Sequence, residues 1–243
     1  MRIFLVTIVF LLQIKFASGQ VIISLLLGDV LNTGKIEFGL EGGANLTDIS
    51  GLDGKAKTNF NLGFYFDIKL KNQDWMVHTG VIVKSNMGID ELPVYSLNNP
   101  DLDAAFEGGE VYRQIKYFNV PIMMKYKSSK HIFVQGGFQL GLRTKAKDKF
   151  SNKIIDKEDL TFELDISDDF HRIDAGLAAG IGYRLLGGNG MNINLNYYYG
   201  LIDITISDSA PDQFNRSLYL TLGIPIGAGK AEAKKEGKET EGK

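Results

Sequence analysis

The chain has 243 residues, of which 44% are hydrophobic, and a formal net charge of -2. This length allows one large β domain or two small ones, and without a surplus of basic residues nothing indicates nucleic-acid binding. The absence of cysteine excludes a disulfide scaffold and thiolate chemistry.

The first nineteen residues have the layout of a secretory signal peptide. Arg2 gives a positively charged start, an apolar run follows, and the small residues Ala17 and Gly19 form a cleavage site. A transmembrane helix is the alternative, but the apolar run is short and Lys15 interrupts its flank. We therefore expect residues 1–19 to be a signal peptide and the mature chain to be exported.

Two segments flank the main body of the chain. Residues 20–34 are apolar and then turn-like, and their periodicity does not distinguish a short helix from an extra strand or a plug. Residues 228–243 are rich in Lys, Glu and Gly, with no apolar residue larger than Ala. Because such a tail cannot bury a core, we expect it to be disordered and periplasmic. Residues 35–227 remain as the folded domain.

Within this domain, apolar side chains alternate with small or polar ones. In the hairpin Tyr117–Arg143, for example, the even positions from Phe118 to Tyr126 are all apolar. Side chains alternate between the two faces of a strand, so one face of the hairpin is apolar. The same pattern predicts eight strands, over residues 36–46, 59–70, 75–86, 117–126, 131–143, 172–185, 191–201 and 217–227.

The links and the polarity of the strands indicate the architecture. Short links alternate with long ones, which lie around residues 47–58, 87–114, 146–169 and 202–215. No charged residue falls on the apolar face within the strand cores, as lipid outside a barrel requires. The sequence predicts an all-β fold, an eight-stranded antiparallel transmembrane β-barrel of the outer-membrane type. Short turns would be periplasmic, long loops extracellular, and the location the bacterial outer membrane.

Outward aromatic residues gather at both ends of the predicted strands. Although aromatic residues favour strands in general, this two-ended distribution indicates interfacial girdles in contact with outer-membrane lipid. The predicted girdle residues are Phe60, Trp75, Phe118, Tyr126, Tyr183 and Tyr199.

Charged residues also occur on the inward face. An eight-stranded barrel is just wide enough to be filled by side chains, so we interpret these charges as ion pairs that plug the lumen. A proton or ion path is the alternative. The predicted network consists of Glu37, Glu41, Asp67, Lys69, Lys125, Arg143, Arg172, Asp174 and Arg184, and strand phase also places Lys84 inward. His78 and His131 lack ligand-spaced companions, so we expect neither a metal nor a cofactor.

Four stretches resemble one known family. They are IEFGLEGGANLTDISG, NVPIMMKY, FVQGGFQLGLRTKAK and AGLAAGIGYRL, in this order. Together they are similar to the PorT-like outer-membrane β-barrel proteins of Bacteroidetes-type bacteria, over about residues 35–227. The resemblance implies an outer-membrane barrel without catalytic residues, and some relatives support protein secretion and gliding. Many such barrels end at an aromatic residue, whereas here the last strand ends at Pro225-Ile226-Gly227.

The four long links carry formal charges of about 0, -5, -4 and -3. Such acidic loops could attract divalent cations or basic partners, or could simply be solvated and variable. We expect a non-enzymatic, monomeric, closed barrel with an envelope-structural, partner-binding or secretion-accessory role.

Two other functions are alternatives to this one. A small barrel could bind an apolar ligand, but the apolar face points outward here. An outer-membrane protease could use Asp169 and His171 with Asp101 and Asp103 as a water-activating pair. Strand phase, however, turns Asp169 and His171 away from the lumen, and eight strands are too few for that protease family.

Overall fold

The computed structural model describes residues 35–72, 74–128, 131–155, 158–185, 190–207 and 211–226. The predictions for residues 1–19, 20–34 and 228–243 lie outside the described residues. The strands are β1 (Ile36–Ser50), β2 (Lys55–Lys69), β3 (Trp75–Leu92), β4 (Glu110–Lys127), β5 (Ile132–Ile155), β6 (Glu158–Asp165), β7 (Ile173–Arg184), β8 (Asn192–Gly200) and β9 (Phe214–Pro225). The helices are α2 (Pro100–Phe106) and the 3-10 helix η1 (Ser167–Asp169). Neither is long and apolar enough to cross a membrane.

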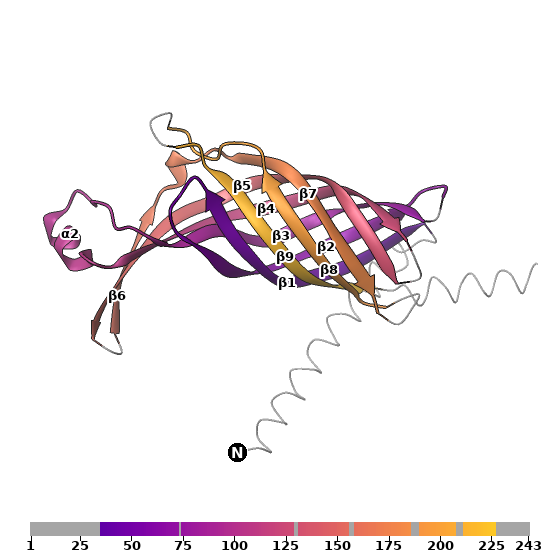
Figure 1. Ribbon diagram of the computed structural model, residues 1–243, viewed down its shortest axis with the longest axis horizontal. Coiled ribbons are helices and arrows are strands. Elements are labelled where there is room, and N and C mark those ends of the chain that lie inside the picture. Colours follow the sequence, from indigo (N-terminus) through magenta and orange to yellow (C-terminus); the bar gives the residue numbers. More distant parts are fainter. Residues whose placement is uncertain are drawn as a thin grey trace, which may run out of the picture.

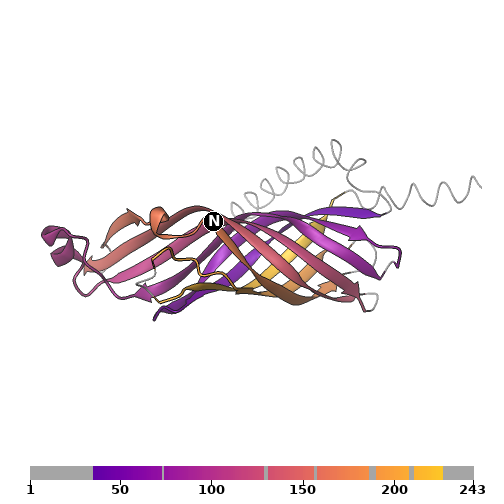
Figure 2. The same ribbon diagram turned by 90° about the horizontal axis from the view of Figure 1, so that it is seen from above.

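Eight of these strands form a closed ring, which confirms the predicted fold. Every neighbouring pair is antiparallel, and the order is β1-β2-β3-β4-β5-β7-β8-β9. β1 closes the ring by pairing with β9 from Gly39↔Pro225 to Ser50↔Phe214. The strands are tilted around a common axis (Figures 1 and 2). A closed ring leaves no unpaired strand edge within the barrel.

The polarity of the two faces is that of a membrane barrel. Large apolar side chains cover the outside, and Phe138 and Ile173 are 61% and 60% exposed. Asn61, Asn194 and other polar side chains are buried inside. Lipid is the outer solvent that this arrangement requires.

The prediction of a loop over residues 47–58 is wrong, because most of these residues belong to β1 and β2. β1 and β2 continue to a tight turn at residues 51–54, and β1 stays paired with β9 as far as Ser50. Gly51 has a φ of 96°, and a Cβ on it would lie 2.2 Å from the carbonyl oxygen of Asp212. Glycine therefore allows the chain to reverse close to its neighbour.

The predicted loops 87–114 and 146–169 also contain regular structure. β3, β4 and β5 continue past the ring, and β6 adds to β5 alone. Figure 1 shows α2 and β6 at the far end of this extension. The extension, β3–β5 beyond the ring with α2, β6 and η1, is called the outer sheet below.

Candidate functional site: the barrel lumen and its outer closure

The inner half of the lumen, which is the half towards the short turns, contains a polar network around Asp67 of β2. One carboxylate oxygen of Asp67 accepts from Lys125 Nζ at 2.6 Å, and the other lies 2.7 Å from Nδ1 of His78. All three side chains are buried, with 2% exposure for Asp67 and 3% for Lys125. The ammonium of Lys125 also lies 3.9 Å from the centroid of the Phe133 ring. Both oxygens of this buried carboxylate therefore have a polar partner, and Lys125 supplies the compensating charge.

A second pair joins β1 to β7 across the lumen. The guanidinium of Arg184 donates to Glu37 and, through Nε, to Asn192 at 2.9 Å. The hydroxyl of Tyr65 donates to the same Glu37 carboxylate at 3.2 Å. Both predicted members, Glu37 and Arg184, therefore lie in one network at the short-turn end.

Glu41 lies further along the lumen and is buried. With His78, Met123, Tyr219 and other side chains it lines a small cavity, with about 20 Å³ of space for the centre of a water molecule. A second cavity of the same size lies at the short-turn end, beside Asp67, Lys125 and Arg184. Each of these cavities has room for about one water molecule, whereas a channel would need a continuous water-filled path through the lumen.

Polar side chains form hydrogen bonds with one another across the middle of the lumen. Asn119 donates to the Ser85 hydroxyl at 2.8 Å, and that hydroxyl lies 3.1 Å from the Tyr219 hydroxyl. The Asn215 amide donates to Asp174 at 2.8 Å and to Tyr117 at 3.2 Å. Asp174 is buried as predicted, but its neighbours here are amides and phenols instead of a cation.

An apolar core closes the long-loop end. Its fully buried members come from the barrel strands and from the outer sheet and loops, and they meet across the barrel mouth. The core includes Ile49, Met87, Ile89, Phe106, Val111, Ile115, Phe150 and Ile204. The sequence analysis did not predict this core. Met87 and Ile89, like Ala146 and Phe150, are apolar and an even number of residues apart, so they continue the strand pattern into the predicted loops.

One buried ion pair fixes the loops over this core. Arg113 of β4 donates from Nε and Nη2 to the two oxygens of Asp148 on β5, at 2.9 and 2.7 Å. Tyr95, from the link before α2, donates to Asp148 at 3.0 Å. Gln213 accepts from Arg113 at 3.4 Å, and the ring of Phe170 lies 5.3 Å from the guanidinium carbon. We call Arg113, Asp148, Tyr95 and Gln213 the loop clamp.

Five residues of the predicted network form no ion pair within the described residues: Glu41 and Asp174, which are buried in the lumen, and Lys69, Arg143 and Arg172. Lys69 is exposed, because it is the last residue of β2 and its side chain reaches solvent at the barrel rim. Arg172 is also exposed, because β7 begins only at Ile173 and the strand phase does not extend to it. Arg143 lies beside a register shift between β4 and β5, and its guanidinium donates to the carbonyl oxygens of Phe170 and His171.

Lys84 also points outward, against the prediction. The register of β3 on β4 shifts between Ile82 and Ser85, which inverts the phase of the residues between them. The ammonium of Lys84 lies 5.5 Å from the Phe60 ring on the outer face. A bulge of this kind cannot be located from the alternation of side chains alone.

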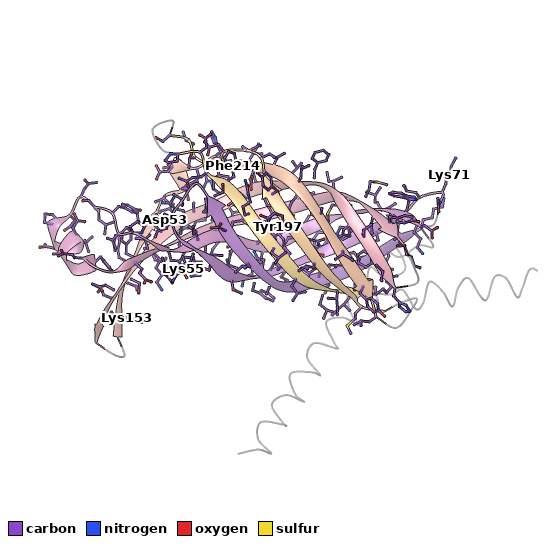
Figure 3. The ribbon with its side chains drawn as sticks, viewed as in Figure 1. Asp53, Lys55, Lys71, Lys153, Tyr197 and Phe214 are labelled. Carbon is purple, nitrogen blue, oxygen red and sulfur yellow. The ribbon has the colours of Figure 1, made fainter. Side chains whose placement is uncertain are left out.

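The predicted girdle residues lie on the outer surface at the two ends of the barrel. At the short-turn end the rings of Trp75 and Tyr126 are 4.8 Å apart, and Tyr183 stacks on His131 at 5.4 Å. At the other end Phe60, Phe118 and Tyr199 are exposed. Side chains at the two ends, including Lys71 and Lys153, can be followed in Figure 3.

The acidic residues considered for a protease are in separate settings. Asp103 of α2 accepts from Ser96 Oγ and from the Leu97 amide, both at 2.7 Å. Asp169 and His171 are exposed beside η1, and their backbones bond to residues 204–206. Within the described ranges, no group of three or more His, Asp or Glu residues could hold a metal ion.

Comparison with known proteins identifies a family. Residues 24–205 match the family described as outer membrane protein beta-barrel domain. No curated protein matches the chain.

Several solved structures are similar at low identity. Ail, the attachment invasion locus protein of Yersinia pestis, is 18% identical, with a TM-score of 0.42, over 78% of this chain and 97% of that one. Neisserial surface protein A is 12% identical, with a TM-score of 0.38, over 78% and 96%. OprG of Pseudomonas aeruginosa is 16% identical, with a TM-score of 0.33, over 78% and 91%.

Proposed function

The chain belongs to the outer-membrane protein β-barrel domain family, and from this membership we propose that it is a closed, non-enzymatic barrel whose outer sheet binds a partner. It is an outer-membrane protein. A role in binding at the cell surface or in the envelope is the function that its geometry supports best. No cofactor is part of the proposal, and the chain is proposed to act as a monomer.

The apolar core across the outer mouth carries this proposal. Ile49, Met87, Val111 and Ile115 are fully buried where a channel would need a wet opening. Water and ions do not cross a packed apolar core without displacing it. The polar network in the inner half therefore supports a structural interpretation of the lumen charges over a proton or ion path.

The outer sheet supplies the proposed binding surface. The loop clamp joins β4 and β5 to two links of the outer sheet, which favours a preformed surface for a partner. The link that contains α2 carries an excess of acidic residues, among which Asp101 and Glu107 are exposed, and Glu110 at the start of β4 is exposed as well. A basic protein or peptide is the partner that this charge favours.

The four stretches similar to PorT-like proteins of Bacteroidetes-type bacteria extend the proposal to a secretion-accessory role. Two observations weigh against the other candidates. The lumen cavities each have room for about one water molecule, which is too little for an apolar ligand. The residues of the protease hypothesis share no contact that would make them a catalytic pair.

Capture from intact cells tests the partner. Whole cells that display the protein would be cross-linked and the adducts purified in detergent, for the wild type and for Asp101→Asn combined with Glu107→Gln. We expect the double variant to lose a basic adduct, while Asp74→Asn at the short-turn end retains it. An adduct pattern identical in all three proteins would contradict binding through the acidic outer surface.

Cysteine labelling tests the orientation on which the proposal depends. Lys153 and Lys71 are exposed at opposite ends of the molecule (Figure 3). We expect an impermeant maleimide to label Lys153→Cys but not Lys71→Cys on intact cells, and both after lysis. Labelling of Lys71→Cys alone would reverse the orientation.

A further inference from the structure

The carboxylate of Glu41 is buried in the lumen without a polar partner. Glu41, on β1, is 7% exposed. Among the residues that the structure describes, none forms a hydrogen bond or an ion pair with this carboxylate. Each of the other lumen carboxylates accepts a hydrogen bond from a side-chain nitrogen, and these are Glu37, Asp67 and Asp174. Glu41 differs from them in that its negative charge is left unpaired.

The wall of the barrel leaves space beside this carboxylate. Glu41 lies opposite Gly63 on β2 and opposite Gly223 on β9, so neither neighbouring strand places a side chain directly next to it. The cavity that Glu41 lines together with His78 and Met123 has room for about one water molecule. An alkali cation is no larger than a water molecule, so the same space can hold one.

Oxygen-bearing side chains line this cavity from three further strands. They carry hydroxyl or amide groups, and they are Gln139, Asn196, Tyr198, Tyr219 and Thr221. More oxygen lies on the adjoining wall, where the amide oxygens of Asn61 and Asn194 are buried and accept no hydrogen bond. Asn194 is opposite Thr221 in the ladder of β8 and β9. Oxygen ligands of these kinds are the ones that hard cations bind.

A buried charge without compensation destabilises a fold strongly, so Glu41 has to bind either a proton or a cation. Neither of the nearby basic side chains takes this role. Lys125 donates to Asp67, and the ring of His78 contacts Asp67 at 2.7 Å and forms no ion pair with Glu41. We propose that the cavity binds one monovalent metal cation, such as Na⁺, against the Glu41 carboxylate. A single carboxylate balances a single positive charge, which favours a monovalent ion over a divalent one.

The proposed cation is a structural component of the barrel, and it is independent of the partner of the outer sheet. Side chains line the cavity, and the apolar core closes the long-loop end of the lumen. The cation therefore enters as the barrel folds and remains in place. A ligand that binds only the folded state stabilises that state. The identity of the cation in solution should then change the stability of the barrel at constant ionic strength.

The test measures reversible urea unfolding of the full-length protein in uncharged lipid vesicles, at mildly alkaline pH. Each titration is run in sodium chloride and in N-methylglucamine chloride at the same ionic strength. The organic cation keeps the screening constant but is too large for the cavity. The variants are Glu41→Gln, which keeps the side-chain shape without the charge, and a matched control, Glu107→Gln, which neutralises an exposed glutamate of the outer sheet. Migration on unheated gels shows whether each variant forms the barrel.

Sodium should lower the unfolding equilibrium constant of the wild type about tenfold relative to N-methylglucamine, which is the effect of a free ion at about ten times its dissociation constant. Glu107→Gln should keep this difference and Glu41→Gln should lose it. Thr221→Val removes one lining hydroxyl without changing the charge, and it should reduce the difference even if Glu41→Gln does not fold.

Two outcomes would overturn the proposal. Equal stability of the wild type in both salts would show that no cation binds and that a proton neutralises Glu41. A sodium effect of full size in both Glu41→Gln and Thr221→Val would show that the ion binds elsewhere.

Discussion

At the scale of single residues, Asp67 is the point on which the inner polar network converges. It accepts from Lys125 and contacts His78, and all three side chains are buried. In a lumen of this width, a buried carboxylate is tolerated only when its charge is compensated. The Lys125–Asp67 pair is therefore a structural requirement of the closed barrel.

Replacement of Lys125 should destabilise the barrel strongly. Lys125→Met keeps most of the side-chain volume but leaves Asp67 with the imidazole alone, and removal of one partner of a buried pair costs about 3–5 kcal/mol. Lys69→Met is the control, because Lys69 lies on β2 two residues after Asp67 but is exposed. Urea unfolding in lipid vesicles measures both. Equal midpoints for the two variants would contradict the role given to the ion pair.

Asp103 should make the link around α2 sensitive to acid. The Ser96 hydroxyl and the Leu97 amide hold the pKa of Asp103 below its ordinary value of 3.8. Because the lowered pKa belongs to the folded state, these bonds stabilise the link fully above pH 3.8 and are lost as the pH falls through the lowered value. Hydrogen exchange at the Leu97 amide, corrected for its intrinsic rate, should show this loss of protection.

The neutral variant Asp103→Asn provides the control for this effect. Its side-chain oxygen can still accept from Leu97 but does not titrate in this range, so protection should be weaker and independent of pH. If the variant and the wild type lost protection in parallel on acidification, another group would be responsible.

At the scale of elements, the outer sheet is stabilised by the loop clamp. Arg113 of β4 holds Asp148 of β5 with two hydrogen bonds, and Tyr95 and Gln213 join them from two different links. Asp148 is fully buried, so its charge depends on Arg113. The planar fork of arginine suits this geometry, and lysine cannot reproduce it.

Arg113→Ala should loosen the outer sheet while the barrel stays folded. The fully buried Asp148 would lose its cation, and removal of one partner of a buried pair lowers stability by about 3–5 kcal/mol. We expect this loss to destabilise the loops that the clamp joins. Limited proteolysis should cut within residues 93–109 and 201–213, the links that hold Tyr95 and Gln213, at least tenfold faster, with unchanged migration on unheated gels. Lys153→Ala, exposed on the same sheet, should behave as the wild type. Faster unfolding of the whole barrel, with no selective cleavage, would contradict a local role.

At the scale of the whole molecule, the protein combines two cores in one ring of strands. The inner half of the ring encloses polar and charged side chains, while the long-loop end encloses an apolar core continuous with the outer sheet. The first arrangement fills the narrow lumen and the second closes its mouth. A molecule built in this way supports binding at its outer surface better than transport through its centre.

The purified protein should accordingly form no stable channel. In planar bilayers the wild type should show no porin-like conductance steps, because the spaces in its lumen are of the order of a single water molecule. A porin reconstituted in parallel serves as the positive control. Stable conductance steps from the wild type would refute the closed barrel.

Period-two alternation by itself determined that eight strands form the ring and that their apolar faces point outward, although it did not reveal β6. It worked because lipid requires an unbroken apolar outer face, so the pattern of strands such as β4 and β7 can be read residue by residue. The pairs Glu37–Arg184 and Asp67–Lys125 could also be anticipated from the sequence, because strand phase places both members of each pair inward at the same end of the barrel.

Only the tertiary structure decided where the alternation shifts and where the strands end. The register shifts near Lys84 and at Thr144 invert the phase of the residues that follow, and a two-residue pattern carries no record of an inserted residue. The length of β3, β4 and β5 beyond the membrane depends on packing against α2 and β6, which are distant in sequence or come later in the chain. The loop clamp arises from the same long-range pairing, which brings together residues that no local pattern connects.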